Sequence, residues 1–303
     1  MNPVAGDVFQ ASLATSALGA LWGWGLSLLL GAMLLPQRGL EDPGGKLLSW
    51  LVLGTALQAQ WWLLLGLLGR LTPTLVLGTA GALTALGGAV AGRRVLRALP
   101  RRPSGARVLQ RAAGNWLFSA SSLTTAAFLL VVGLLATWPT VFYDDLVYHL
   151  GLPRQALLTG HWPALPGLHY SFMPAGWDGV YVLPLALGGG NGPQLMNVLG
   201  LGLFAWAVYR LARRGGEPGS AAAATALLVM APMFTSLGAF AGNDLFVGLA
   251  LCVAMDRLLA DAGRSPASVG VLLGAAWGAK YSALPGCAGI VAAGATATAS
   301  KTA

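Results

Sequence analysis

The sequence predicts an all-α, polytopic helical membrane protein with about eight to nine transmembrane helices. Composition is the first reason: of 303 residues, 56% are hydrophobic and only 9% are charged, whereas about 25% of the residues of a soluble domain are charged. A soluble fold of this length could not hide so much apolar surface. The second reason is pattern. The apolar runs are continuous and do not alternate with period two, which favours helices over the strands of a membrane barrel.

The predicted spans are apolar stretches of about 20 residues, the length needed to cross a hydrocarbon core of about 30 Å. Arginine and lysine mark their ends. A weaker Ala/Gly-rich stretch follows at 286–299, which brings the expected number to nine. The stronger stretches lie at 11–35, 47–69, 73–92, 115–137, 179–209 (interrupted at 188–193), 220–240, 245–260 and 267–284.

The first three spans form a predicted N-terminal membrane extension, residues 1–92. No basic residue precedes the first apolar run, and no small-residue cleavage site ends it. Both features would be expected of a secretory signal peptide. We therefore expect a retained helix whose N-terminus lies outside the cytoplasm.

An arginine-rich linker, residues 93–114, follows the extension. Seven arginines fall within 19 residues that contain no acid, and the positive-inside rule places such a linker in the cytoplasm. Anionic-lipid binding is the alternative interpretation of this cluster. Nucleic acid is not an expected partner despite the net charge of +8, because the 18 basic residues are too few and too scattered to follow a phosphate backbone.

The third segment, residues 115–303, is the predicted transmembrane core. Alternation of the spans puts its first large loop, 138–178, on the extracytoplasmic side. This loop is rich in aromatic residues and proline, and we expect it to carry short interfacial helices.

Ten acidic residues are few enough to consider individually. Six lie in termini or short cytoplasmic loops near arginine or lysine, where solvation explains them; these are Asp7, Glu41, Asp42, Glu217, Asp256 and Asp261. The other four map to the outer face, where an ionisable group near membrane depth is costly and therefore indicates function. These four are Asp144, Asp145, Asp178 and Asp244.

The densest polar segment surrounds two adjacent acids. A short helix stopped by Pro153 would align Asp144 with Tyr148 and Asp145 with His149. Two carboxylates and an imidazole on one face could share a divalent cation, or could provide a general base near neutral pH. Helix capping is the alternative, but capping needs only one acid and leaves the histidine unexplained.

The remaining candidates lie farther along the outer face. Lys280 stands at the outer end of a span, against the positive-inside trend. Its side chain either snorkels to the interface or binds an anion such as phosphate. The three histidines are spaced by 12 and 8 residues, which matches no compact zinc pattern. The full substrate-binding set comprises His149, Arg154, His169, Tyr170, Asp178, Asn243, Asp244, Lys280 and Tyr281.

Four segments occur in a distinctive order: WPTVFYDDLVYHLGLPRQALLTGHW, HYSFMPAGWDGVYVLPLALG, AGNDLFVGLAL and GAAWGAKYSALPG. In this order they resemble the GT-C class of integral membrane glycosyltransferases. The most similar branch is that of the bacterial transferases related to protein O-mannosyltransferases and to the lipid A aminoarabinose transferase. The resemblance covers residues 115 to about 290.

The resemblance implies a role for each outer acid. Asp144 matches the first-loop aspartate that serves as the catalytic base, and Asp145 occupies the neighbouring position. Asp178 matches an acid at the end of the loop, and Asp244 an acid in the later outer turn. Lys280 matches the lysine that faces the phosphate of the donor, which in this class is a polyprenyl-phosphate sugar.

These observations together predict a hexosyl or pentosyl transferase in a bacterial cytoplasmic (inner) membrane, with an extracytoplasmic site. Asp144, and with it Asp145, would provide the catalytic carboxylate, and the sugar would invert its configuration on transfer to a hydroxyl of a glycan, lipid or protein. Lys280, Arg154, or a divalent cation (Mg or Mn) held by Asp145 and Asp244 would neutralise the leaving phosphate.

Two alternatives remain open. A membrane transporter would carry ionisable residues on broken helices at mid-membrane. A non-catalytic or truncated scaffold is the other alternative, because the chain stops soon after Lys280, where many members of the class carry several more helices.

Overall fold

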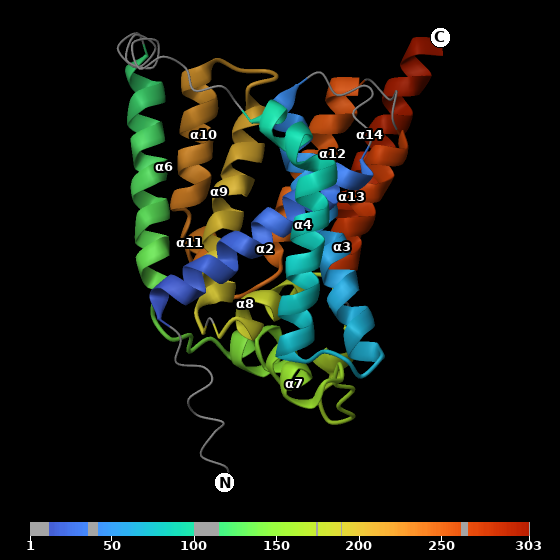
Figure 1. Cartoon of the computed structure of the whole chain (residues 1–303). Helices are drawn as coiled ribbons and strands as arrows, with labels where there is room; N and C mark the ends of the chain where they lie inside the picture. The colour runs from blue at the N-terminus through green and yellow to red at the C-terminus, as the bar shows by residue number, and fades with distance from the viewer. Residues whose placement is uncertain are drawn as a thin grey trace.

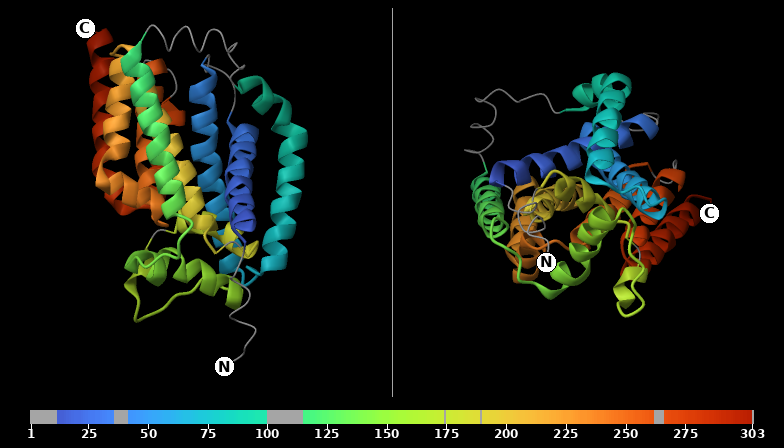
Figure 2. Two further views of the ribbon diagram at one scale, coloured as in Figure 1. Left: turned by 90° about the vertical axis from the view of Figure 1, so that its left-hand side faces the viewer. Right: turned by 60° about the horizontal axis from the view of Figure 1, so that its bottom comes forward.

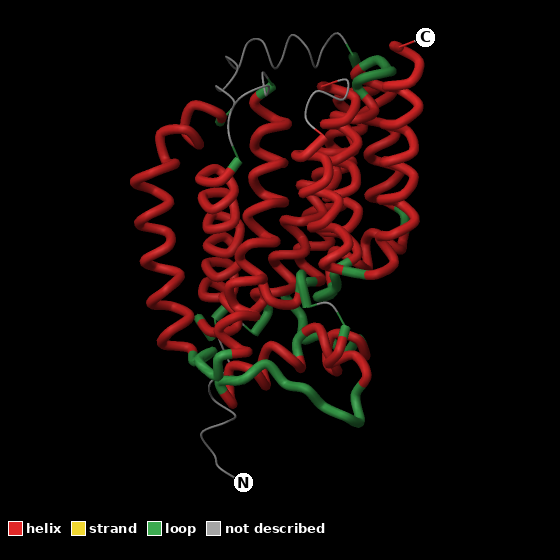
Figure 3. Tube along the Cα trace, turned by 90° about the vertical axis from the view of Figure 1, so that its right-hand side faces the viewer, coloured by secondary structure: helices red, strands yellow, loops and turns green. Residues whose placement is uncertain are grey.

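The computed structural model describes residues 12–35, 42–99, 115–173, 175–188, 190–261 and 266–302. All regular secondary structure in these ranges is helical, as the sequence predicts (Figure 3). Much of the predicted arginine-rich linker, together with Asp7 and Glu41, lies outside the described residues.

Long helices form a bundle in which the chain runs back and forth between two ends (Figure 1). Proline or a polar N-cap starts most of them; for example, Asp42, Thr72 and Asn115 each accept a hydrogen bond from a backbone N–H of the first turn. The bundle helices are α2 (Leu13–Leu34), α3 (Pro43–Leu67), α4 (Pro73–Ala98), α6 (Trp116–Leu135), α9 (Gly192–Ala212), α10 (Pro218–Met230), α11 (Pro232–Ala239), α12 (Asp244–Asp261), α13 (Pro266–Ala279) and α14 (Leu284–Thr302).

The two ends of the bundle differ in character. We call one the basic end, because α4 closes there with Arg93, Arg94 and Arg97 and α9 closes there with Arg210 and Arg213. The other, the loop end, carries the segment from 138 to 191 (Figures 1 and 3). Its short helices are η1 (Asp145–His149), α7 (Gly151–Thr159), η2 (His169–Phe172), η3 (Asp178–Tyr181) and α8 (Val182–Ala186), with η4 (Tyr281–Ala283) between α13 and α14.

Five described helices are long and apolar enough to cross a membrane: α2, α3, α4, α6 and α9. The α10–α11 pair adds a sixth if it forms one span bent by 67°. These helices are compatible with an integral membrane protein, whereas the number of eight to nine spans stays a prediction. The helix α12 carries four charged residues, and α13 has only 14 residues, which correspond to about 21 Å at 1.5 Å per residue.

Two predicted spans are divided in the structure. The stretch 179–209 breaks at Gly188, whose φ of +84° favours glycine, so that only its second part, α9, is a long helix. The stretch 220–240 bends at Pro232, because a proline ring inside a helix excludes a backbone hydrogen bond and clashes with the preceding turn.

The packed core lies among α2, α3, α9, α12 and α13, with large fully buried side chains such as Trp50, Trp62 and Phe246. The helices α4 and α6 lie on the outside of the bundle (Figure 2). Only 22% and 11%, respectively, of their most apolar windows are buried inside the protein, so the other described helices leave most of the apolar surface of both uncovered.

The helices α2 and α3 pack closely against each other at two glycine residues. A Cβ atom on Gly54 would overlap the carbonyl oxygen of Ser27, and one on Gly31 would overlap the carbonyl group of Trp50. Small residues allow the two backbones to touch, which is the usual way for membrane helices to associate closely.

We expect Gly54→Ala to lower the free energy of unfolding by about 1–3 kcal/mol, because the added methyl group forces two backbones apart. Denaturation in mixed detergent micelles measures this change. Gly25→Ala is the matched control on α2: its Cβ would meet nothing within 4 Å, and alanine is the better helix former. Equal stability of the two variants would contradict the proposed α2–α3 contact.

The basic end holds an ion-pair network that the sequence analysis did not anticipate. We predicted that Asp256 is a solvated loop acid, and this is wrong, because the residue is only 4% exposed. Its carboxylate accepts hydrogen bonds from Arg210 Nη2 at 2.9 Å and from Arg214 Nε at 2.5 Å. Arg210 also pairs with Asp42, the N-cap of α3. The network therefore ties the ends of α3, α9 and α12 together.

Candidate active site

The polar segment at the loop end forms a π-helical turn that continues directly into α7. The N–H of Leu150 donates to the carbonyl of Asp145 at 2.8 Å, a bond over five residues. Our prediction that Pro153 stops the helix is wrong, because this residue is the third of α7, where an intrahelical N–H donor is not needed.

Asp144 lies just before the π turn and is partly exposed. Its carboxylate accepts a hydrogen bond from Tyr148, as their spacing of four residues predicts. Burial, and then this bond and the charge of Asp144, raise the pKa of Tyr148 above its ordinary value. Asp144 makes no side-chain capping bond, so helix capping does not explain its presence.

Asp145, unlike Asp144, is buried inside the protein and is 0% exposed. Its Oδ2 accepts hydrogen bonds from Thr140 Oγ1 at 2.7 Å and from the backbone N–H of Ala241 at 2.9 Å. Burial raises the pKa of Asp145, and the two hydrogen bonds oppose this shift. The residue therefore fastens η1 to the turn between α11 and α12.

His149 and Asp178 form a buried pair at the centre of the loop end. Their Nδ1 and Oδ1 atoms lie 2.6 Å apart, and the residues are 3% and 6% exposed. Burial alone would lower the pKa of His149, but the charge and the hydrogen bond of Asp178 outweigh it, so the net shift is upward. The pair joins η1 to η3 in the form of an imidazole oriented by a carboxylate.

This pair predicts a pH dependence of stability. A histidine whose pKa is raised in the folded state stabilises the folded protein. This contribution to the free energy of unfolding is complete below the unfolded-state pKa of about 6.5, and it is lost as the pH rises through the folded-state pKa. We therefore expect the free energy of unfolding to fall as the pH rises above about 6.5. Denaturant titration at several pH values measures it. Asp178→Asn should remove this pH dependence of the free energy of unfolding, and the control His169→Gln should keep it. An unchanged pH dependence in Asp178→Asn would contradict the His149–Asp178 pairing.

A series of four rings connects η1 to η2. The ring of Tyr148 lies 4.1 Å from that of His149 and stacks on Tyr170 at 4.3 Å with an interplanar angle of 9°. His169, which is exposed, contacts Tyr170 at 3.9 Å. The stack runs from the buried His149–Asp178 pair to the surface, and it holds the aromatic loop against the π turn.

The other predicted polar residues lie at the start of α12 and the end of α13. Lys280 Nζ is 2.6 Å from Asp244 Oδ1, and their side chains are 36% and 39% exposed. Asn243 is 6% exposed and donates to the carbonyl of Ala279 at 3.1 Å. Tyr281 is 59% exposed. Lys280 is therefore neutralised by an acid, and both side chains of the pair remain partly exposed.

Direct contacts connect these two groups of residues. Asp145 holds Ala241 in the turn that leads to Asp244. On the other side, Gly176 lies so close to Gly278 that a Cβ atom would overlap its carbonyl oxygen. The elements that carry the four outer acids thus touch one another at the loop end, and Arg154 lies half-buried on the adjoining α7. A single cavity shared by all of these residues stays a prediction.

Sequence reasoning missed a buried hydrogen-bond network behind the site. The hydroxyl of Tyr181 accepts from Trp177 Nε1 and lies 2.8 Å from Asn197 Oδ1. Asn197 Nδ2 donates to the carbonyls of Phe240 at 2.6 Å and Gly242 at 2.9 Å. The network fixes the turn that Asp145 binds. A buried asparagine within the apolar run of α9 is the signal that could have indicated it.

A divalent cation shared by Asp145 and Asp244 stays a prediction. One oxygen of Asp145 accepts two hydrogen bonds and the other, Oδ1, is buried without a partner, while Asp244 pairs with Lys280. Mg²⁺ and Mn²⁺ need several oxygen ligands. The described part of the chain contains no group of three or more His, Cys, Asp or Glu residues that could hold a metal ion.

One pocket adjoins the site. It has a volume of about 240 Å³ and lies between the end of α6, the following loop and α11. Its wall includes Thr140, whose hydroxyl bonds Asp145, and Phe240, on which Phe142 stacks at 4.8 Å. The rest of its lining is largely apolar: Leu135, Trp138, Pro139, Val141, Thr235, Ser236 and Ala239.

Comparison of the sequence with protein-family models and curated proteins, and of the fold with solved structures, finds no match.

Proposed function

We propose that the protein is an integral membrane glycosyltransferase that moves a sugar from a polyprenyl-phosphate donor to an acceptor hydroxyl. One observation carries this proposal: a partly exposed carboxylate, Asp144, lies beside a buried His149–Asp178 pair, at the same end of the bundle as the partly exposed Lys280. A base and a phosphate-binding cation are the two groups that such a transfer requires.

Asp144 is the better base of the two adjacent acids. Its carboxylate is partly exposed and is oriented by Tyr148, so it can accept the proton of an acceptor hydroxyl as that oxygen attacks the anomeric carbon. The bond from that carbon to the donor phosphate breaks, and the configuration inverts. Asp145 is fully buried and acts as a positioning residue that fixes the π turn.

Lys280 stabilises the phosphate that leaves with the polyprenyl chain. An ammonium group needs no catalytic acid beside it to do this, because a phosphate leaves as a stable anion. Asp244 holds the ammonium at the surface in the absence of donor. The apolar pocket beside Thr140 is suited to the first isoprene units of the chain, since it opens at the same end. No step uses a metal ion.

The distribution of basic residues gives the orientation of the protein in the membrane. The basic end lies in the cytoplasm by the positive-inside rule, which puts the loop end and the site on the extracytoplasmic side of a bacterial inner membrane. Polyprenyl-phosphate sugars are the donors implied there by the resemblance to the GT-C class. The acceptor is a glycan, a lipid or a protein.

One feature favours a transporter as the second candidate. The α10–α11 span is bent by 67°, and broken helices form the substrate sites of many secondary transporters. Residues 218–239 contain no ionisable side chain, however, so the bend offers no group for proton or cation coupling.

The test is donor consumption. The purified chain in nanodiscs is incubated with polyprenyl-phosphate pentoses and hexoses and with a membrane extract that supplies acceptors. We expect release of free polyprenyl phosphate, measured by mass spectrometry, to depend on the protein. Binding of the donor without release would favour a non-catalytic scaffold, and solute uptake into proteoliposomes without donor would favour a transporter.

A further inference from the structure

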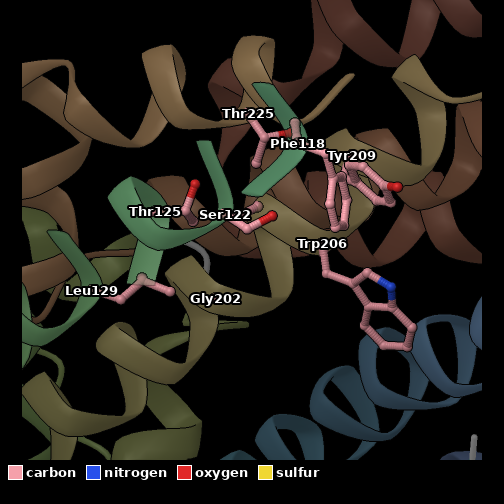
Figure 4. A pocket seen from close by; sticks show the side chains of 10 residues that line it. Phe118, Ser122, Thr125, Leu129, Gly202, Trp206, Tyr209 and Thr225 are labelled. Carbon is pink, nitrogen blue, oxygen red and sulfur yellow. The ribbon is translucent and has the colours of Figure 1, made fainter. Parts of the chain in front are cut away.

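A second pocket lies in the half of the bundle nearer the basic end, between α6, α9 and α10 (Figure 4). It is an open groove of about 300 Å³. The rings of Phe118 and Tyr209 lie 6.3 Å apart at one end of it, and Leu129 and Gly202 lie at the other (Figure 4). The remaining wall is apolar with a few hydroxyl groups: Ser122, Thr125, Ala205, Trp206, Ala222 and Thr225.

The length of the groove matches one leaflet of a bilayer. Phe118 and Leu129 both line it from α6 and are eleven residues apart, which is about 16 Å along a helix. Half of a hydrocarbon core of about 30 Å is about 15 Å. The groove thus extends from the basic end to about the middle of a membrane, and its depth suits a single acyl chain.

A cation stands at the mouth of the groove. On α9, Gly202, Trp206 and Tyr209 line the groove, and Arg213 is the next residue in that row, four positions beyond Tyr209. Arg213 is exposed, and one of its N–H groups donates to the carbonyl of Gly216. A guanidinium has five N–H donors, so Arg213 retains the capacity to bind a phosphate.

Among the described arginines near the mouth, Arg213 is the one best placed to bind an anion. Arg214 already pairs with the buried Asp256 at 2.5 Å. The starts of α6 and α10 meet at the mouth, where Gly219 packs against the side chain of Asn115, and helix N-termini favour negative charge. Glu217 is exposed at the start of α10 and opposes an anion.

We propose that the groove binds one acyl chain of an anionic phospholipid from the leaflet at the basic end, with the lipid phosphate on Arg213. The apolar wall accommodates the chain, its length limits the ligand to one leaflet, and the arginine selects an anionic headgroup. A polyprenyl donor bound at Lys280 has its phosphate at the opposite end, so the lipid site is independent of the proposed glycosyl transfer.

The test compares two lipids on the wild type and five variants. Phosphatidylglycerol and phosphatidylcholine with identical oleoyl chains are titrated onto the delipidated protein in detergent, and bound lipid is counted by native mass spectrometry. Arg213→Gln removes the cation, and Arg97→Gln removes an exposed arginine from α4 at the same end. Gly202→Leu fills the groove, and Gly88→Leu adds the same side chain on α4, where a Cβ meets nothing within 4 Å.

We expect the wild-type chain to bind phosphatidylglycerol about fivefold more tightly than phosphatidylcholine, because one arginine near the headgroup favours an anionic lipid by about this factor. Arg213→Gln should abolish this preference, Gly202→Leu should weaken the binding of both lipids, and the two α4 controls should match the wild type. Glu217→Gln should strengthen phosphatidylglycerol binding.

Equal affinity of the wild type for the two lipids, or an unchanged preference in Arg213→Gln, would overturn the proposal. Arg213 is exposed, so its replacement leaves the fold intact even if Gly202→Leu does not fold. Donor consumption in Arg213→Gln should equal that of the wild type. A loss of lipid preference and a loss of transfer are therefore distinguishable results.

Discussion

Replacement of Asp144 by asparagine is expected to reduce sugar transfer by about 10²- to 10⁴-fold, the usual contribution of a general base. The amide cannot take a proton from the acceptor hydroxyl at neutral pH. It can still accept the hydrogen bond from Tyr148, so the π turn and the ring stack should stay in place. Release of polyprenyl phosphate under single-turnover conditions measures the chemical step directly.

Two controls separate the loss of a base from the loss of structure. Asp144 is partly exposed and caps no helix, so Asp144→Asn should change the free energy of unfolding by less than about 0.5 kcal/mol. Tyr148→Phe keeps the stacking ring and the carboxylate but removes their hydrogen bond, and it should slow transfer only about fivefold. An Asn variant with full activity would rule out Asp144 as the base.

Asp145→Asn should behave differently from Asp144→Asn, although the two residues are adjacent. An amide at Asp145 can keep both hydrogen bonds, because the single oxygen Oδ2 accepts from Thr140 and from the N–H of Ala241. Its NH₂ group would then take the place of Oδ1, which is buried without a partner, and would leave its N–H donors unsatisfied. We therefore expect lower stability together with slower transfer. This contrast between neighbouring acids distinguishes a catalytic residue from a positioning one.

Part of the site could be predicted from sequence because charge is rare in this chain. Asp144, Asp178 and Lys280 stand out in apolar surroundings, and an ionisable group there requires a reason. The different roles of Asp144 and Asp145 could not be predicted. The partner that buries Asp145 is a backbone N–H 96 residues away, and neither local spacing nor helix periodicity contains that information.

The fold, like the site, could be predicted from the sequence only in part. Continuous apolar runs predict α2, α3, α4, α6 and α9, because hydropathy is a local property of about 20 residues. The prediction for Asp256 is wrong for the opposite reason. A position near basic residues at the end of a span indicates a solvated acid, whereas its partners Arg210 and Arg214 are 46 and 42 residues away in the sequence. Tertiary pairing decides where such an acid lies.

The second large effect is expected from Asp256→Ala at the basic end. We expect it to lower the free energy of unfolding by about 3 kcal/mol, because removal of one partner leaves buried charge uncompensated. An arginine cannot lose its proton to relieve this cost. This loss lies at the lower end of the range usual for breaking a buried ion pair, because the side chains of Arg210 and Arg214 are 17% and 33% exposed and water can solvate them in part. Denaturation in mixed micelles measures it.

The control for Asp256→Ala is Glu217→Ala, which removes an exposed acid from the same end and should change stability by less than about 0.5 kcal/mol. A loss below about 1 kcal/mol in Asp256→Ala would mean that water solvates both guanidinium groups. Asp256 lies twelve residues from Asp244 on α12, about 18 Å along the helix. Donor consumption per folded molecule should therefore be unchanged, because the network stabilises the bundle at the end opposite the site.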